Sequence, residues 1–234
     1  MLASYLNHAN KLCLDINFES VFQLVPADGV SIAPHTVFQQ GSIPRIQQSH
    51  SINADLFNDV IFLVRDPLDT LVSFYFHEAR QWHRPVGSIG AFVCARAVGW
   101  VAYMNTWTKR LPLIRSMVLR YEDCGHDEDS YLPAVLRFAG VLDICPEAVN
   151  LAIEQAKFLQ MQAKEVSGPF IPGHRYDLAD TDARRVRRGK IGGWRDYLAQ
   201  QDVEAVRRCI QQASTPALKI FLDKYGYSAY YSTE

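Results

Sequence analysis

Arg65 and Ser73 are residues whose types and spacing could bind an anion. They lie eight positions apart in the stretch VIFLVRDPLDTLVSFY, which also contains Asp66 and Asp69. An arginine fork together with a hydroxyl group can clamp a phosphate. The alternative is an arginine paired with one of these two aspartates and a serine that a helix merely tolerates. This stretch alone leaves both interpretations open.

The basic segment, defined here as Arg184 to Arg195, is a second candidate for anion binding. Within a nearly neutral chain it concentrates the cations Arg184, Arg185, Arg187, Arg188, Lys190 and Arg195. Its glycines, Gly189, Gly192 and Gly193, allow the backbone to approach a ligand closely. The alternatives are a solvated, charged helix end and a nucleic-acid patch.

The elements around Arg65 place it where ligands commonly bind. The apolar run from Val60 to Val64 is typical of a short parallel strand buried on both faces. Asp66 can cap a following helix, Pro67 suits its first position, and Asp69 stands where a capping-box acid would. Arg65 therefore follows the carboxyl end of a strand, where α/β sheets bind ligands, and precedes a helix N-terminus, which attracts anions.

The remaining elements alternate in the manner of an α/β protein with a parallel sheet. We predict helices at 2–13, 89–107, 131–140, 146–164 and 202–225, a second strand at 116–124, and loops at 26–44 and 167–174. The cluster of His77, Glu78 and His83 lacks the spacing of zinc ligands, so we expect a helix surface there.

Composition limits the classes of protein. The 234 residues are 48% hydrophobic, which suits one domain over residues 1–234, and the net charge of −1 argues against a general nucleic-acid binder. The five cysteines are scattered and form no CxxC pair, which favours a reduced compartment. The sequence contains no apolar run of membrane-spanning length, and its first residues are unlike a signal peptide. We therefore expect a cytoplasmic protein.

Three motifs together resemble one known family. LVRDPLDTLVSFYF, VLRYEDC and RRGKIGGW, in this order, are similar to the cytosolic-type sulfotransferases that use 3′-phosphoadenosine 5′-phosphosulfate (PAPS). The resemblance implies a P-loop-nucleotide-kinase-like sulfotransferase fold, PAPS as co-substrate and no metal. It also implies that Arg65 and Ser73 hold the 3′-phosphate, and that Arg187, Arg188 and Gly189 close over it. Arg188 stands for the family's lysine, and Gly193 for its aspartate.

Further site residues follow from the same resemblance. Tyr121 matches a tyrosine near the adenine, and Phe158 matches an aromatic residue against the base. The stretch IPRIQQSH, which ends at His50, resembles the family's Pro-Arg-Ile-Ile-Lys-[Ser/Thr]-His stretch, and the match implies that His50 is the general base. A histidine suits this role because its ordinary pKa, near 6.5, lets it accept a hydroxyl proton at neutral pH. Gln48 stands where the family has a lysine.

The beginning of the chain departs from the family. The family's first strand and its Pro-Lys-Ser-Gly-Thr-Thr-Trp loop have no counterpart, and MLASYLNHANKL resembles the helix that follows that loop. We therefore expect a sulfotransferase domain that is incomplete at its N-terminus, either because the sequence has lost its first residues, which we favour, or because it is a divergent member without this loop. Loss of several donors around a transferring group lowers rates strongly, so we expect weak nucleotide binding and poor transfer by this chain.

Two other functions and several acceptors stay open. One is a non-catalytic nucleotide-binding or interaction protein, and the other is a nucleic-acid binder that uses Arg184 to Arg195. The acceptor could be a small-molecule, carbohydrate or lipid hydroxyl. Aromatic residues at helical spacing could line its pocket or belong to the core, namely Phe74, Tyr75, Phe76, Trp82, Trp100 and Trp107.

Overall fold

A computed structural model gives the structure of the chain and describes residues 1–28, 46–124, 128–168 and 176–231. The chain forms two compact units, each built from two separate stretches. Unit 1 comprises Met1–His50 with Cys124–Gly189, and unit 2 comprises Ser51–Asp123 with Lys190–Glu234. The single domain expected over residues 1–234 stays a prediction. Most of the predicted loop at 26–44 and of that at 167–174 lies outside the described residues.

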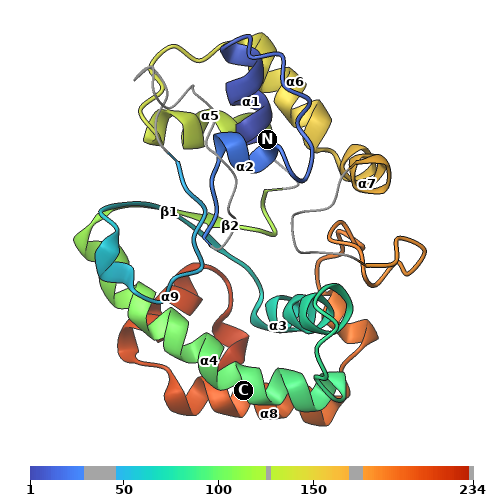
Figure 1. Cartoon of the computed structure of the whole chain (residues 1–234). Coiled ribbons are helices and arrows are strands. Elements are labelled where there is room, and N and C mark those ends of the chain that lie inside the picture. The colour runs from blue at the N-terminus through green and yellow to red at the C-terminus, as the bar shows by residue number, and fades with distance from the viewer. Residues whose placement is uncertain (29–45, 125–127, 169–175, 232–234) are drawn as a thin grey trace. The chain divides into compact units, whose positions relative to one another are not determined.

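Unit 1 is helical in its described part (Figure 1). Its first helix, α1, packs against α6. The helix expected at 2–13 is confirmed in part, because α1 ends at Ala9. The phenol oxygen of Tyr5 accepts the backbone N–H of Cys145 at 3.2 Å, just before α6. Gly140 follows α5 with φ +90°, which favours glycine and ends the helix as predicted. The helices of this unit are α1 (Leu2–Ala9), α2 (Val21–Leu24), α5 (Glu128–Phe138), α6 (Pro146–Ala156) and α7 (Phe158–Ser167).

One predicted helix of unit 1 is interrupted. The helix expected over 146–164 is two helices, because Lys157 has an extended ψ of 143° and separates α6 from α7. The backbone N–H of Met161 then bonds to the carbonyl of Lys157 at 2.9 Å and closes the first turn of α7. Neither proline nor glycine marks this break in the sequence. Its consequence is that Phe158 becomes the first residue of a new helix.

Unit 2 contains a parallel pair of strands, β1 (Asp59–Val64) and β2 (Arg115–Arg120), with helices beside them (Figure 1). Val60 pairs with Ser116 and Val64 with Arg120, so the two strands end at the same edge. The α/β class with a parallel sheet flanked by helices is thereby confirmed. The helices are α3 (Pro67–Phe76), α4 (Ile89–Arg110), α8 (Gln200–Ala213) and α9 (Pro216–Lys224). Short 3₁₀ helices are η2 (Ala54–Leu56), η4 (Leu111–Leu113), η5 (Gly193–Asp196) and η6 (Ser228–Tyr230), and η3 (His77–Gln81) is a π-helix.

The sheet packs on its helices through one face. The ring of Phe62 lies 5.5 Å from that of Trp107 on α4 and 6.1 Å from that of Phe221 on α9, measured between centroids. Phe62 and Val64 are buried, whereas Leu63 between them is 57% exposed. Successive side chains of a strand point to opposite faces, so only one face of β1 is covered. The prediction that this strand is buried on both faces is therefore wrong.

The predicted strand, turn and helix around Arg65 are confirmed. Asp66 caps α3 by accepting the backbone N–H of Asp69 at 2.9 Å, and Pro67 occupies the first helical position. The last predicted helix is in fact two helices. Thr215 caps α9 and Pro216 begins it, and this Thr-Pro pair was a visible signal for a new helix start.

The cluster of His77, Glu78 and His83 is not a plain helix surface. Glu78 is 4% exposed and forms an ion pair with Arg84 at 2.6 Å, so that part of the prediction is wrong. Within residues 1–28, 46–124, 128–168 and 176–231, acidic, histidine and cysteine side chains form no group arranged to hold a metal ion. All five cysteines are free of disulfides.

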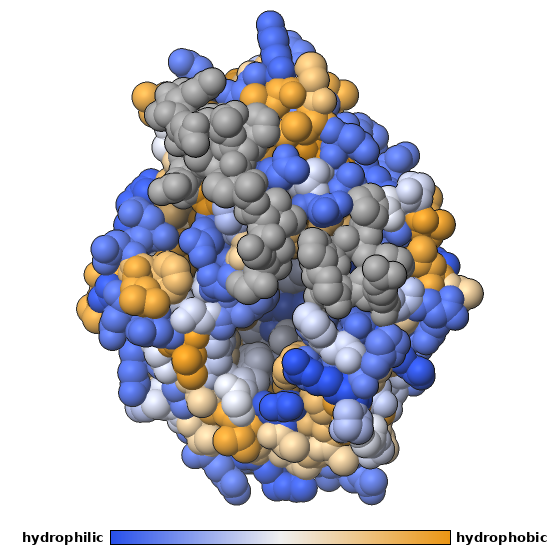
Figure 2. Space-filling view, in the orientation of Figure 1, coloured by the Kyte–Doolittle hydropathy of each residue, from blue (hydrophilic) through white to orange (hydrophobic). Residues whose placement is uncertain are grey.

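The surface that Figure 2 shows is mostly hydrophilic, and the apolar residues on it form separate patches. Exposed apolar side chains include Leu142 in unit 1 and Leu113 in unit 2. Among the helices of the described ranges, each is too short or too polar to cross a membrane.

Candidate functional site

In unit 2, Arg65 and Tyr121 follow the paired ends of β1 and β2 and contact each other. The guanidinium carbon of Arg65 lies 4.3 Å from the ring centroid of Tyr121. The backbone N–H of Tyr121 bonds to the carbonyl of Val64 at 2.8 Å, which extends the pairing of the strands by one residue. Because a planar guanidinium stacks well on an aromatic ring, Tyr121 holds the Arg65 fork in one plane.

The Arg65 guanidinium keeps room for a ligand. Its Nη2 atom lies 3.8 Å from Asp69, an ion pair that is longer than a hydrogen bond. The side chain is 24% exposed, and among the described residues no group accepts a hydrogen bond from its buried Nε atom. Phosphate binding and pairing with an aspartate are thus compatible for Arg65, since the long contact with Asp69 leaves other N–H groups of the guanidinium uncommitted.

Asp69 has a role that the sequence did not indicate. Its carboxylate is buried and accepts the backbone N–H of Gly192 at 2.7 Å and that of Trp194 at 2.9 Å. It does not bond back to the helix cap, so its assignment as a capping-box acid is wrong. Gly192 has φ +69°, a conformation that glycine adopts without strain. Asp69 therefore fixes the unit 2 end of the basic segment to α3.

Two tyrosines and two acids support the turn that carries Arg65. Glu122 accepts the backbone N–H of Asp66 at 2.8 Å and the hydroxyl of Tyr227 at 2.5 Å. Asp66 accepts the hydroxyl of Tyr230 at 2.5 Å. Burial raises the pKa of the Asp66 carboxyl, and burial beside these acids raises the pKa of both tyrosines. No sequence motif announces this network, because its members are far apart in the chain.

Ser73 lies on α3 with an exposed side chain. Within the described residues its hydroxyl bonds to neither Arg65 nor Tyr121. The structure therefore brings together two of the three unit 2 residues expected at the 3′-phosphate and the adenine, and leaves the third open to solvent.

In unit 1, Phe158 and Gly189 are close neighbours. A methyl group added to Gly189 would lie 2.8 Å from Cδ2 of the Phe158 ring, and Gly189 has φ +59°. The backbone of the basic segment thus rests against the ring, where only glycine fits without movement. Phe158 is 37% exposed, so part of its ring is available to a ligand.

The two arginines before Gly189 differ in exposure. Arg187 is 16% exposed in its side chain and forms an ion pair with Asp182 at 3.3 Å. Arg188 is exposed to solvent. Both lie in unit 1, between the contacts of Val186 and Gly189 with α7.

His50 is exposed at the end of a segment that backbone bonds hold in place. Gln48 pairs with 26–28, since its N–H bonds to Pro26 at 2.8 Å and its carbonyl accepts the N–H of Asp28 at 3.1 Å. The side-chain nitrogen of Gln48 lies 3.5 Å from Nε2 of His50. Residues 43–45 of the motif that identified His50 lie outside the described residues.

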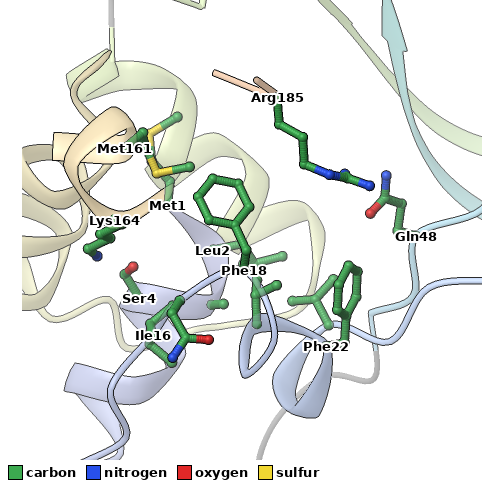
Figure 3. A pocket seen from close by; sticks show the side chains of 14 residues that line it. Met1, Leu2, Ser4, Ile16, Phe18, Phe22, Gln48, Met161, Lys164 and Arg185 are labelled. Carbon is green, nitrogen blue, oxygen red and sulfur yellow. The ribbon is translucent and has the colours of Figure 1, made fainter. Parts of the chain in front are cut away.

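A pocket of about 300 Å³ lies in unit 1 and is walled mainly by apolar side chains (Figure 3). Phe18, Phe22 and Met161 are among these walls, and the guanidinium of Arg185 points toward Gln48. Gln48 lines this pocket and its side-chain nitrogen also lies beside the candidate base, His50, which is not itself one of the lining residues.

The aromatic residues that could have lined an acceptor pocket are part of unit 2. Phe76 and Trp107 are buried in its core, Tyr75 and Trp100 pack against that core, and Phe74 and Trp82 are partly exposed. Sequence reasoning did not single out Phe18 or Phe22. Their position after the N-terminal helix carried no periodic signal.

Comparisons with known proteins agree on one family. Residues 18–218 match the family model described as sulfotransferase domain. Sulfotransferase 2A6 of Mus musculus is 24% identical over 183 residues, which cover 72% of this chain and 63% of the relative. The 3-alpha-hydroxysteroid sulfotransferase of Cavia porcellus is 24% identical over 163 residues, which cover 65% of this chain and 55% of the relative. The chain thus spans between 55% and 63% of the length of these two relatives.

A solved structure shows the same fold. The crystal structure of mouse sulfotransferase SULT7A1 complexed with PAP, the adenosine 3′,5′-bisphosphate, superposes with a TM-score of 0.62 at 16% identity. The match covers 97% of this chain and 84% of that chain. At this identity the likeness establishes the fold alone.

Proposed function

The chain belongs to the sulfotransferase-domain family, and from this premise we propose that it binds PAPS and transfers the sulfuryl group to a hydroxyl acceptor. The observation that carries the proposal is the contact between Arg65 and Tyr121 at the shared end of the strands. This contact presents an ordered cationic fork where α/β sheets bind ligands.

Local features of both units fit an adenosine that carries a 3′-phosphate. The buried Nε of Arg65 lacks a partner among the described residues, which suits an anionic oxygen. In unit 1, the partly open ring of Phe158 can stack on a base, and the backbone at Gly189 has the close approach that phosphate loops use. We assign the 3′-phosphate to Arg65, Ser73, Arg187, Arg188 and Gly189, and the adenine to Tyr121 and Phe158.

The chemistry requires a base for the acceptor. PAPS supplies an activated sulfuryl group, with the bisphosphate as leaving group. In our proposal His50 accepts the proton of the acceptor hydroxyl while the hydroxyl oxygen forms its bond to sulfur and the bond from sulfur to the phosphate oxygen breaks. Gln48, 3.5 Å from the imidazole, is placed to orient the ring or the incoming hydroxyl.

The unit 1 pocket favours an apolar alcohol as acceptor. Its walls are largely apolar, and Gln48, one of the lining residues, has its side-chain nitrogen 3.5 Å from Nε2 of His50. Small-molecule sites commonly combine apolar walls with a few polar groups that orient the ligand. The guinea-pig relative is named for a 3-alpha-hydroxysteroid, which is an alcohol of this kind.

The basic segment offers little support for a nucleic-acid binder. Within the described residues, Arg187 pairs with Asp182, Lys190 pairs with Asp196 at 2.8 Å, and Arg195 lies 4.3 Å from the ring of Trp194. These cations are held by the protein itself and do not form an open charged stripe.

Calorimetric titration with adenosine 3′,5′-bisphosphate and with adenosine 5′-monophosphate tests the nucleotide site. We expect the bisphosphate to bind at least about tenfold more tightly, because charge-assisted bonds to the extra phosphate are made only by that ligand. Equal affinities in a folded chain would contradict the proposal. Transfer is tested with labelled PAPS and a hydroxysteroid, against the matching ketosteroid, which has no hydroxyl to accept the group.

A further inference from the structure

One face of α7 carries Phe158, Gln162 and Glu165, spaced so that they lie along the same side of the helix. All three contact the unit 1 part of the basic segment, and all three contacts lie within that unit. Phe158 meets Gly189, and the side-chain nitrogen of Gln162 donates to the carbonyl of Val186 at 3.0 Å. The segment therefore runs along α7 in the opposite direction, with Glu165 at its beginning.

Glu165 makes the strongest of these contacts. Its carboxylate is 4% exposed and accepts the backbone N–H of Arg185 at 2.5 Å and that of Val186 at 2.9 Å, one on each oxygen. The hydroxyl of Tyr176 donates to the same carboxylate at 2.5 Å. A buried carboxylate needs such donors, and bonds to an ionised acceptor are stronger than neutral ones. Burial next to Glu165 also raises the pKa of Tyr176.

These contacts fix the backbone on both sides of the two arginines assigned to the 3′-phosphate. Arg185 and Val186 are held by Glu165 before them, and Gly189 rests on the Phe158 ring after them. Arg187 and Arg188 thus occupy a short stretch whose register against the base-stacking ring is set by α7.

We propose that Glu165 is the positioning residue for this phosphate-binding stretch, an inference that rests on the proposed function. It acts through the backbone and does not touch the nucleotide. Two adjacent N–H groups require an acceptor on each side-chain oxygen. A glutamine amide has only one oxygen, so its NH₂ group would face one of the two donors. The role therefore needs the carboxylate itself and not only a side chain of its size.

The test compares Glu165→Gln and Glu165→Ala with Val166→Ala, a control on the exposed side of the same helix. Affinities for adenosine 3′,5′-bisphosphate and adenosine 5′-monophosphate are measured by calorimetry, and hydrogen exchange is followed at the amides of Arg185 and Val186. Both Glu165 variants should lose about tenfold of the preference for the bisphosphate, while affinity for the monophosphate changes by less than about twofold. Amide exchange should rise in both variants, and the control should match the wild type.

Each other outcome overturns the inference. A folded Glu165→Gln variant that keeps the bisphosphate preference and slow exchange would show that the segment holds its position without this carboxylate. An equal loss of affinity for both nucleotides would indicate a structural role only. If the alanine variant does not fold, the glutamine variant decides. A wild-type chain that shows no preference for the bisphosphate would overturn the proposed function, and the positioning role with it. If the wild type shows the preference and only the Glu165 variants depart from the expected result, the positioning role is overturned and the proposed function stands.

Discussion

Tyr230 donates a hydrogen bond to Asp66, with 2.5 Å between the phenol oxygen and the carboxylate. Tyr230 belongs to η6, late in the chain, whereas Asp66 caps α3 directly after Arg65. The segment that follows α9 thereby buttresses the turn at the end of β1, and both partners belong to unit 2.

Replacing Tyr230 with phenylalanine should destabilise the protein by about 1–2 kcal/mol, because one buried oxygen of Asp66 loses its donor while the ring still packs. Denaturant unfolding measures this loss. The neighbouring change Tyr231→Phe is the control: its hydroxyl bonds to Asp223, which is exposed, so we expect the stability to stay within about 0.5 kcal/mol of wild type. Equal effects of the two changes would argue against the Asp66 bond as the cause.

The stability of the protein should depend on pH through Asp66. Burial raises the folded-state pKa of this carboxyl above its unfolded value of about 3.9. Between the two pKa values the folded state binds more protons than the unfolded state. The contribution of Asp66 to the free energy of unfolding is therefore present at low pH and is lost as pH rises. Asp66→Asn keeps a cap acceptor but cannot titrate. The free energy of unfolding, measured from pH about 4 upward, should fall less steeply in this variant than in wild type.

Arg65→Lys should weaken binding of adenosine 3′,5′-bisphosphate about tenfold and change adenosine 5′-monophosphate binding little. Lysine keeps the charge but loses the planar fork that lies 4.3 Å from the Tyr121 ring centroid. Tyr121→Phe is the matched change, since it keeps an aromatic ring under the arginine. Calorimetry on both variants would contradict our assignment if lysine bound the bisphosphate as well as arginine does.

The sequence predicted the local parts of this site well. The strand, the Asp-Pro turn and the helix around Arg65 follow from neighbouring residues alone, through an apolar run, a cap and a proline. The contact of Arg65 with Tyr121 was not predicted. The second strand was expected over 116–124, whereas β2 ends at Arg120, so that Tyr121 directly follows it and meets Arg65.

The partners of the buried acids could not be predicted in the same way. Asp69 bonds to Gly192 and Trp194, and Glu165 bonds to Arg185, so each acid serves backbone N–H groups far along the chain. Any residue can supply a backbone N–H, and the sequence at these positions therefore carries no mark of the pairing. The break at Lys157 was also missed, since α6 ends at a lysine with an extended ψ and neither proline nor glycine stands there to mark it.

His50→Ala should lower the rate of sulfuryl transfer by about 10²–10⁴-fold, because positioned general bases commonly contribute that much. Affinity for the bisphosphate should stay within about twofold, since the imidazole is not assigned to the nucleotide. His50→Gln should be similarly slow, as an amide cannot accept the proton. A transfer assay in which His50→Ala keeps wild-type turnover would remove this residue from the mechanism.

Gly189→Ala should displace the Phe158 ring and weaken nucleotide binding. The added methyl group would lie 2.8 Å from the ring, and the φ of +59° adds strain of about 1 kcal/mol. Gly140→Ala is the matched control, because Gly140 has φ +90° and a methyl group there would meet nothing within 4 Å. The two changes share the backbone strain, so any larger effect at Gly189 reports the contact with the ring.

A double-mutant cycle isolates that contact. Combining Gly189→Ala with Phe158→Ala removes the ring that the methyl group meets, so the stability cost of the glycine change should shrink to that of Gly140→Ala, a coupling of about 1 kcal/mol. Affinity for adenosine 5′-monophosphate should fall a few-fold in Gly189→Ala and stay at the wild-type level in Gly140→Ala, since only the first change moves the proposed base platform. If Gly189→Ala costs the same stability with and without the Phe158 ring, the ring does not require glycine at this position, and the close approach of the two residues has no role in holding the base.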